Sequence, residues 1–293
     1  MSGKRKRMTE VAMEGLVRAS GIATIAFVVL ILALLLREGL PVFRCTTPAK
    51  FLFGRDWLPL SDVFGILPLI LASLLVTLGA VLISIPLGAA VAVYIAEVAP
   101  PRMKEILKPA VETLAAIPSV VIGFIGLLVI APLVRSVFGL PTGLTAFTGS
   151  LMLAFMALPT VVSIAEDAVT AVPTEYRAAS LALGATKWQT IKLVVVPAAR
   201  SGIFAGAMLG VGRVIGETMT VLMVTGNAAV IPHSIFQPVR TMTATIAAEM
   251  GETVQGSPHY FALFAIGLVL FAITFAINLL ADVAIHRSPS GGR

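Results

Sequence analysis

The sequence predicts an all-α integral membrane protein with six membrane-spanning helices. Hydrophobic residues make up 58% of the 293-residue chain and charged residues only 12%, about half the charged share of a soluble domain. The apolar residues fall in long continuous runs instead of the short alternating segments of a membrane β-barrel. Because lipid offers no hydrogen-bond partners to the backbone, such runs must cross the membrane as helices.

The first apolar run covers residues 20–36 and follows a polar, basic segment at residues 1–19. It ends at Arg37 without the small-residue cleavage site of a signal peptide. We therefore predict an uncleaved first helix. The basic cluster Lys4–Arg7 is interpreted as a determinant of membrane topology, with a specific lipid site as the alternative.

The next segments differ sharply in polarity. Residues 37–63 contain several prolines and Gly54, which predicts an irregular exterior loop. Residues 64–96 are nearly uncharged, and the run is too long for one upright span and too short for two. It predicts a single tilted helix that bends near Pro86 and Gly88. A short basic loop is predicted from Glu97 to Lys108.

The rest of the chain alternates apolar runs with polar connections in the same way. The third to sixth spans are predicted at residues 111–134, 144–165, 201–226 and 259–285. The connections between them are residues 135–143, 166–200 and 227–258, with a short helix expected at 241–250 and a short tail at 286–293.

Six spans place both termini on the same side of the membrane. The segments on that side contain more than twice as many Lys and Arg residues as the segments on the other side. Because short basic segments stay inside the cell, both termini are predicted to be cytoplasmic. This asymmetry accounts for most of the net charge of +6, so no nucleic-acid partner is predicted.

Cysteine and histidine give no sign of a metal site. Cys45 is the single cysteine, so no intramolecular disulfide or thiolate cluster is predicted. The three histidines, His233, His259 and His286, lack the spacing of metal ligands.

The most unusual stretch is Gly210 to Thr220, because it places two charges inside an apolar run. Arg213 and Glu217 are four residues apart, which is one turn of a continuous helix. A charge at the middle of a membrane costs about 3 kcal/mol even on the lenient insertion scale. Either the two residues form an ion pair that fixes helix packing, or they face a polar path and act on a charged cargo.

The connection at residues 173–197 predicts two short helices with a turn between them. Glu175 suits a first helical turn, and Gly184 is placed to end that helix. Thr186 and Gln189 match a capping box that begins a second helix, which Pro197 closes. The segment is either a plain surface hairpin between spans or a docking element for a cytoplasmic partner.

This helix–Gly–helix segment resembles the coupling loop of ABC importer permeases, written EAA-x3-G-x9-I-x-L-P. Ala178-Ala179-Ser180 stands in the place of EAA, and Gly184 keeps its spacing to the closing Pro197. The chain departs from the pattern at Ala178, which replaces the glutamate. The charged residue of the pattern is therefore missing at that position, while the helix–Gly–helix shape is kept.

Other stretches resemble the phosphate-uptake (Pst) permeases, over roughly residues 60–285. They read AIPSVVIGFIGLLVIAPLV (116–134), LPTVVSIAEDAVTAVP (158–173), GVGRVIGETMTVLMVTGN (210–227), TMTATIAAEMGE and GSPHYFALFAIGLVLF (both within 241–271). The last three are more similar to the PstC-type subunit than to its PstA-type sister.

The resemblance implies the type I ABC importer permease fold in a prokaryotic plasma (inner) membrane, with lipid around it. It also implies a PstA-like sister permease, two copies of a PstB-like ATPase and a PstS-like phosphate-binding protein. The chain has no G-x-x-x-x-G-K-[ST] motif, so ATP and Mg are expected on the ATPase and no cofactor on this chain. The residues expected to couple to the ATPase are Glu175, Ala178, Ala179, Ser180, Gly184, Ala185 and Thr186.

Phosphate is a multiply charged oxyanion, and a guanidinium offers it a planar fork of donors. We therefore expect Arg213 to bind or steer phosphate, while Glu217 holds Arg213 between turnovers or pairs with the sister subunit. The candidate pathway residues are Arg213, Glu217, Thr218, Thr220, Ser119 and Thr160. Alternatives are a sulfate or molybdate permease, an ion-coupled secondary transporter, or a membrane enzyme, for which no catalytic cluster is seen.

Overall fold

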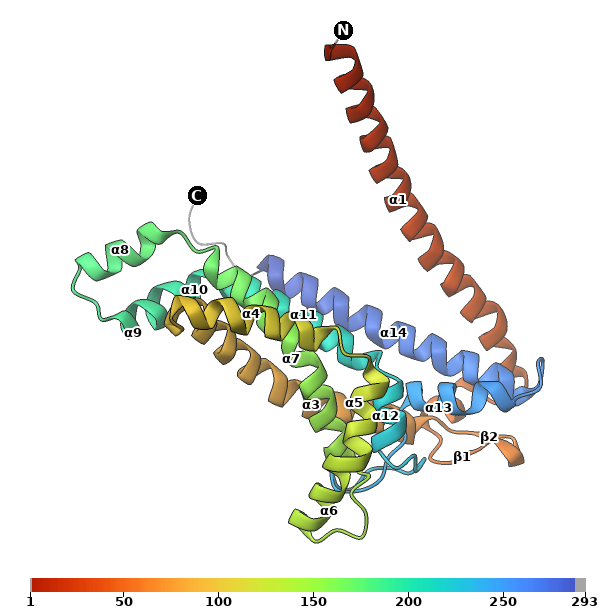
Figure 1. Cartoon of the computed structure of the whole chain (residues 1–293). Helices are drawn as coiled ribbons and strands as arrows, with labels where there is room; N and C mark the ends of the chain where they lie inside the picture. Colours follow the sequence, from red (N-terminus) through yellow and green to blue (C-terminus); the bar gives the residue numbers. More distant parts are fainter. Residues whose placement is uncertain (1, 288–293) are drawn as a thin grey trace.

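The computed structural model describes residues 2–287, and most of them are helical (Figure 1). The elements in chain order are α1 (Ser2–Gly39), η1 (Leu40–Arg44), α2 (Pro48–Phe53), β1 (Trp57–Leu58), η2 (Pro59–Ser61), β2 (Val63–Phe64), α3 (Leu67–Val93), η3 (Tyr94–Val98), α4 (Pro101–Ala115), α5 (Ser119–Ile125), η4 (Gly126–Ile130), α6 (Ala131–Phe138), α7 (Ala146–Thr170), α8 (Thr174–Ala182), α9 (Lys187–Thr190), η5 (Ile191–Val195), α10 (Val196–Ala198), α11 (Arg200–Ile215), α12 (Met219–Val224), α13 (Met242–Glu249), η6 (Met250–Glu252) and α14 (Pro258–Arg287). Most of the predicted tail, residues 288–293, lies outside the described residues.

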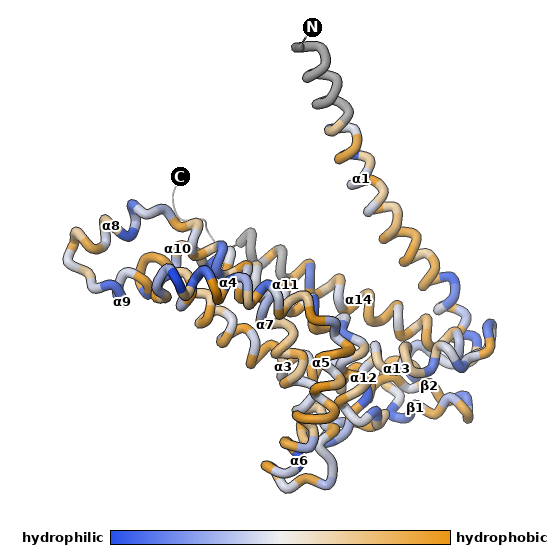
Figure 2. Tube along the Cα trace, in the orientation of Figure 1, coloured by the Kyte–Doolittle hydropathy of each residue, from blue (hydrophilic) through white to orange (hydrophobic). Residues whose placement is uncertain are grey.

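The membrane-spanning helices agree with the predicted architecture. Within the described residues, five helices are long and apolar enough to span: Met13–Arg44, Leu67–Val98, Ser119–Phe138, Ala146–Thr170 and Pro258–Leu280. A sixth span results only when Lys187–Ala198 and Arg200–Ile215, which meet at 67°, are counted as one broken span. This pair starts earlier than the predicted fifth span at 201–226, because its first half belongs to the predicted hairpin at 173–197. In Figure 2 the spanning helices α3 and α7 are coloured mainly orange and white, whereas α4 carries blue, hydrophilic residues.

Helices α3, α7 and α11 form the centre of the bundle, and small residues let them approach closely. A Cβ added at Gly79 would lie 2.4 Å from Ser150 Oγ, and one at Gly88 would lie 2.7 Å from Val161 Cγ1. From the other side, a Cβ at Gly210 would lie 2.6 Å from Val161 Cγ2. In lipid, such small-residue contacts replace the hydrophobic effect as the source of helix association.

Helix α1 stands apart from this bundle along most of its length (Figure 1). It meets α14 near its C-terminal end, where a Cβ at Gly39 would lie 3.1 Å from the Ala265 backbone. Apolar side chains nearer the N-terminal end of α1, such as Ile22 and Phe27, are exposed. Exposed apolar side chains of this kind are suited to a lipid environment.

Two predicted loops are wrong in detail. Residues 37–63 are not irregular, because they contain η1, α2 and the antiparallel β1–β2 hairpin that pairs Trp57 with Phe64. Residues 101–108 belong to helix α4, which Pro101 begins at its first turn. The third span therefore starts at Ser119 and not at residue 111, because Pro118 restricts the backbone before it and separates α4 from α5.

Candidate functional site

The fifth span is interrupted at the stretch that carries the two membrane charges. Helix α11 ends at Ile215 and α12 begins at Met219, with Gly216, Glu217 and Thr218 between them. Glycine is a poor helix former, and the Glu217 amide returns to Val214 O instead of continuing the α-helical ladder. The prediction of one continuous helix over 201–226 is therefore wrong, and Arg213 and Glu217 do not share a helix face.

Arg213 reaches from α11 to two neighbouring segments. Its Nη2 donates to the carbonyl oxygen of Ala115 at 3.3 Å, and its Nη1 donates to Thr160 Oγ1 at 3.5 Å. Its Nε is buried and has no hydrogen-bond partner among the residues that the structure describes. Both bonds are long beside the 2.7–2.9 Å of a charge-assisted bond, and both acceptors are neutral. The Arg213 charge is therefore not matched by a carboxylate within the described part of the chain.

Glu217 turns to a different side. Its Oε1 accepts a hydrogen bond from the Thr220 amide at 3.2 Å, which satisfies a free donor in the first turn of α12. Its carbonyl oxygen accepts from Thr243 Oγ1 at 2.8 Å. Glu217 also lines a small cavity of about 10 Å³, which has room for roughly one water. The other polar residues that line this cavity are Ser73, Thr77, Thr241 and Thr243. Glu217 thus caps α12 and does not hold Arg213.

The predicted hydroxyl residues fall into two groups. Thr160 lies beside Arg213. Thr220 is buried and donates to the carbonyl oxygen of Ser119 at 3.0 Å, which joins α12 to α5. Thr218 donates to Gly216 O within the break itself. The structure therefore brings Arg213 and Thr160 together and places Ser119, Thr218 and Thr220 around the break.

The predicted hairpin at 173–197 is confirmed. Helix α8 is followed by Gly184, whose φ of +84° favours glycine, and α9 starts with the capping box of Thr186 and Gln189. The hairpin projects from the end of the bundle opposite the β1–β2 hairpin (Figure 1). Its coupling residues Glu175, Ala178, Ala179, Gly184 and Thr186 are exposed, whereas Ser180 and Ala185 are half-buried.

Apolar side chains on the same hairpin are also exposed. Leu183 is 90% exposed and Trp188 65% exposed, and Tyr176 is exposed as well. Large apolar side chains exposed on an otherwise polar segment are typical of an interaction surface. The geometry favours a docking element over a plain connection.

Two ion-pair groups near this hairpin were missed from the sequence. Arg177 on α8 binds Glu97 in η3. Lys108 on α4 binds both Glu166 and Asp167 at 2.7 Å, and hydrogen bonds to Asp167 and Glu166 raise the pKa of Lys108, so its ammonium stays charged. The partners are 80 and 58 residues apart, beyond any local pattern.

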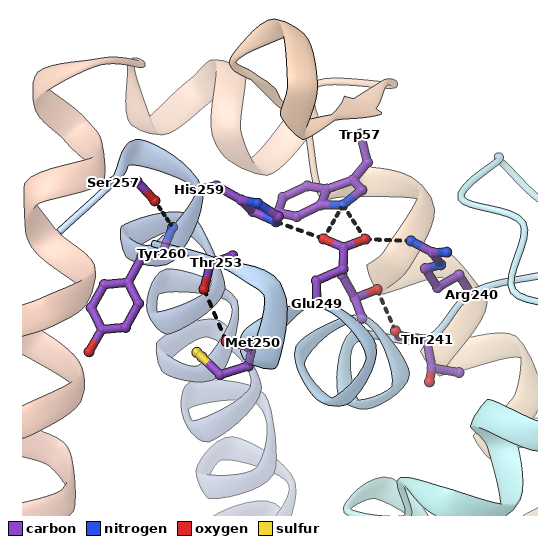
Figure 3. A network of polar contacts seen from close by, with 10 residues as sticks. Trp57, Arg240, Thr241, Glu249, Met250, Thr253, Ser257, His259 and Tyr260 are labelled. Atoms are coloured by element: carbon purple, nitrogen blue, oxygen red, sulfur yellow. Dashed lines mark hydrogen bonds and ion pairs between the residues drawn. The ribbon is translucent and has the colours of Figure 1, made fainter. Parts of the chain in front are cut away.

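A third polar group lies at the opposite end of the molecule (Figure 3). Glu249 accepts hydrogen bonds from Trp57 Nε1 at 3.1 Å and from Arg240 Nη1 at 2.5 Å, and it contacts His259 Nε2 at 2.8 Å. These side chains come from the β1–β2 hairpin, the loop before α13, and the start of α14. Glu249 therefore ties three segments of this end together.

Comparisons with known proteins agree with this architecture. Residues 85–288 match the family model of the binding-protein-dependent transport system inner membrane component. The chain is 39% identical to the probable ABC transporter permease protein YqgH of Bacillus subtilis, over 95% of this chain and 92% of that protein. It is 37% identical to the phosphate transport system permease protein PstC of Mesorhizobium japonicum, over 81% of this chain and 78% of that protein.

Solved structures show the same fold at low identity. The chain is similar to a bacterial alginate ABC transporter (TM-score 0.63, 15% identity, 97% of this chain and 98% of that chain). It is also similar to the inward-facing MetNI methionine ABC transporter (TM-score 0.62, 16% identity, 79% and 98%). The fold is that of a type I ABC importer permease, and the chain belongs to the inner-membrane components of binding-protein-dependent transport systems, with the PstC permeases among its relatives.

Proposed function

We propose that this chain is a transmembrane permease subunit of an ATP-driven importer that moves inorganic phosphate into the cytoplasm. Relatives that carry the name PstC support the cargo. The observation that carries the proposal is Arg213, a cation inside a membrane domain whose Nε is buried without a partner. A permanent guanidinium held by two long bonds to neutral oxygens retains most of its capacity for an anion.

Phosphate suits this arrangement for a chemical reason. Its oxygens accept several hydrogen bonds at once, and one guanidinium edge donates to two of them. Thr160 Oγ1 lies beside Arg213 and offers a further donor. Glu217 is occupied by the α12 amide, so an arriving anion does not have to displace a carboxylate from Arg213.

The exposed hairpin α8–α9 supports a division of labour between subunits. An ABC ATPase that binds ATP and Mg docks on this hairpin, in two copies beneath this chain and a PstA-like sister, and this chain binds no cofactor. A PstS-like protein delivers phosphate to the opposite end, near Glu249. Both termini are then cytoplasmic, on the hairpin side of the membrane.

The test is uptake of labelled phosphate by the complete complex in proteoliposomes. The binding protein is supplied on the side opposite the α8–α9 hairpin, and ATP is supplied on the side of the ATPase. Arg213→Gln should abolish most uptake, and Arg213→Lys should retain part of it. Arg135→Gln, the same change at an exposed position, is the matched control and should transport normally. Normal uptake by an assembled Arg213→Gln complex would exclude the proposed role.

The same uptake assay separates phosphate from other oxyanions. Unlabelled phosphate should compete with labelled phosphate, whereas sulfate and molybdate should not. Competition by sulfate or molybdate at comparable concentrations would assign the permease to a different oxyanion and leave the role of Arg213 intact.

A further inference from the structure

Arg177 is a single side chain that connects three structural elements. From α8 its Nε and Nη2 donate to Glu97 Oε1 in η3, at 2.9 and 2.6 Å. Its Nη2 also donates to the carbonyl oxygen of Val169 at 3.0 Å, and its Nη1 donates to the carbonyl oxygen of Val172. Val169 lies in the last turn of α7 and Val172 lies two residues beyond it, in a region where backbone carbonyls lack the N–H donors of a further helical turn. Arg177 therefore joins α8 to both α3, through η3, and α7.

The joint is protected from solvent. The Arg177 side chain is 21% exposed and the Glu97 side chain 11%. An exposed ion pair on long flexible side chains contributes little, but a shielded guanidinium with several donors engaged is fixed in one geometry. Removing either partner leaves the other charge shielded from water without compensation.

Apolar packing does not position α8. No residue of α8 is buried, so the hydrophobic contacts that hold α3, α7 and α11 together do not extend to it. Beneath it, Val169, Val172 and Val195 pack with Ala96 and Ala199, which fixes the ends of the hairpin but not the helix that lies between them. Ser180 on α8 shares a hydrogen bond of 3.0 Å with Thr190 on α9, which holds the two helices of the hairpin together. The polar contacts of Arg177 are the ones that tie α8 to α3 and α7.

The two limbs of the hairpin are attached differently. The α9 limb continues through η5 and α10 into α11, with a 67° bend at Ala199. The α8 limb follows Pro173, where the backbone is extended (φ −56°, ψ 140°). Arg177 is the side chain that connects α8 to α7 across this extended residue. If that connection is lost, α8 can pivot relative to α7.

We propose that Arg177 and Glu97 form a coupling joint, through which displacement of the exposed hairpin is transmitted to α3 and α7. Arg177 is then a positioning residue for transport. This inference rests on the proposed function, in which an ATPase docks on the hairpin. Loss of the joint lets the hairpin follow the ATPase while α3 and α7 stay behind, so that ATP is hydrolysed without movement of cargo.

The experiment compares ATP hydrolysis with phosphate uptake in the same purified complexes in proteoliposomes. For Arg177→Gln, phosphate moved per ATP hydrolysed should fall at least about fivefold, the lower end of measured coupling between distant sites. Arg177→Lys keeps the charge but cannot reach Glu97 and the α7 carbonyls together, so its ratio should be intermediate. Arg102→Gln, an exposed arginine at the start of α4, is the matched control and should keep the wild-type ratio.

A double-mutant cycle distinguishes a joint from general damage. Glu97→Gln should also lower the ratio, and the double variant Arg177→Gln/Glu97→Gln should be no worse than Arg177→Gln alone. If Arg177→Gln does not assemble with the ATPase, Arg177→Lys and Glu97→Gln carry the test. Uptake and hydrolysis that fall in proportion, or additive effects of the two changes, would overturn the inference. Failure of the proposed function has a different signature, because the wild-type complex itself would then not transport phosphate.

Discussion

Arg177 and Arg213 are both shielded arginines, but the chain uses them in opposite ways. Arg177 is held by a carboxylate and by backbone carbonyls, with bonds as short as 2.6 Å to Glu97. Arg213 has two long bonds to neutral oxygens and a buried Nε without a partner. A saturated guanidinium fixes the elements that it contacts, whereas an unsaturated one remains available to a ligand. Partner satisfaction, more than burial or charge, separates the structural arginine from the candidate binding arginine.

The largest expected effect concerns the unsaturated arginine. Each hydrogen bond from a charged group contributes about 1.5–3 kcal/mol, so Arg213→Gln should weaken phosphate transport roughly 10- to 100-fold. Apparent affinity for labelled phosphate in the reconstituted complex measures this effect. An equal loss of transport in the control Arg135→Gln would contradict a specific role for Arg213.

For the free energy of unfolding, Arg177→Gln should have a larger effect than Arg213→Gln. Arg177→Gln should lower the unfolding free energy by about 2–3 kcal/mol, because it leaves the shielded Glu97 carboxylate and the Val172 carbonyl without the guanidinium donor. Arg213→Gln should change it by less than about 1 kcal/mol, because it also removes an unpartnered buried nitrogen. Thermal unfolding of the two purified variants in the same detergent gives the comparison. A larger destabilisation by Arg213→Gln would contradict our distinction.

The helices that the joint connects should be sensitive to crowding. Gly88→Ala places a Cβ within 2.7 Å of Val161 Cγ1 and should destabilise the chain by about 1–3 kcal/mol through overpacking. Gly212→Ala is the matched control on α11, where a Cβ meets nothing within 4 Å. That variant should be neutral or up to about 1 kcal/mol more stable, because alanine is a better helix former. Thermal unfolding measures both, and similar values for the two variants would argue against close α3–α7 packing.

The smallest effect is expected in the exposed hairpin. Thr186→Ala removes the side chain that caps α9 and should cost about 1 kcal/mol of local helix stability. Hydrogen exchange of the Lys187–Thr190 amides should accelerate, while exchange in α7 stays unchanged. Faster exchange in α7 as well would show that the hairpin is more tightly integrated with the bundle than the Arg177 contacts indicate.

Local pattern predicted more of this protein than long-range contact did. The hairpin at 173–197 was predicted in its shape because a C-terminal glycine and a capping box are signals read within a few residues. The short helix at 241–250 was confirmed as α13, where Thr241 accepts from the Ala244 amide. Helix α4 was misread as a loop because its basic residues resemble a connection, although Pro101 is a good first helical residue.

The sequence by itself determined that the chain is a helical membrane protein, where its main apolar helices lie, and that Arg213 needs a partner. These follow from hydropathy and from the cost of a charge in lipid, which are local quantities. Only the tertiary structure decided the break at Gly216–Thr218, the separation of Glu217 from Arg213, and the Arg177–Glu97 joint. Each depends on a carbonyl, hydroxyl or carboxylate supplied from another helix, and the sequence spacing of such partners carries no signal of their contact.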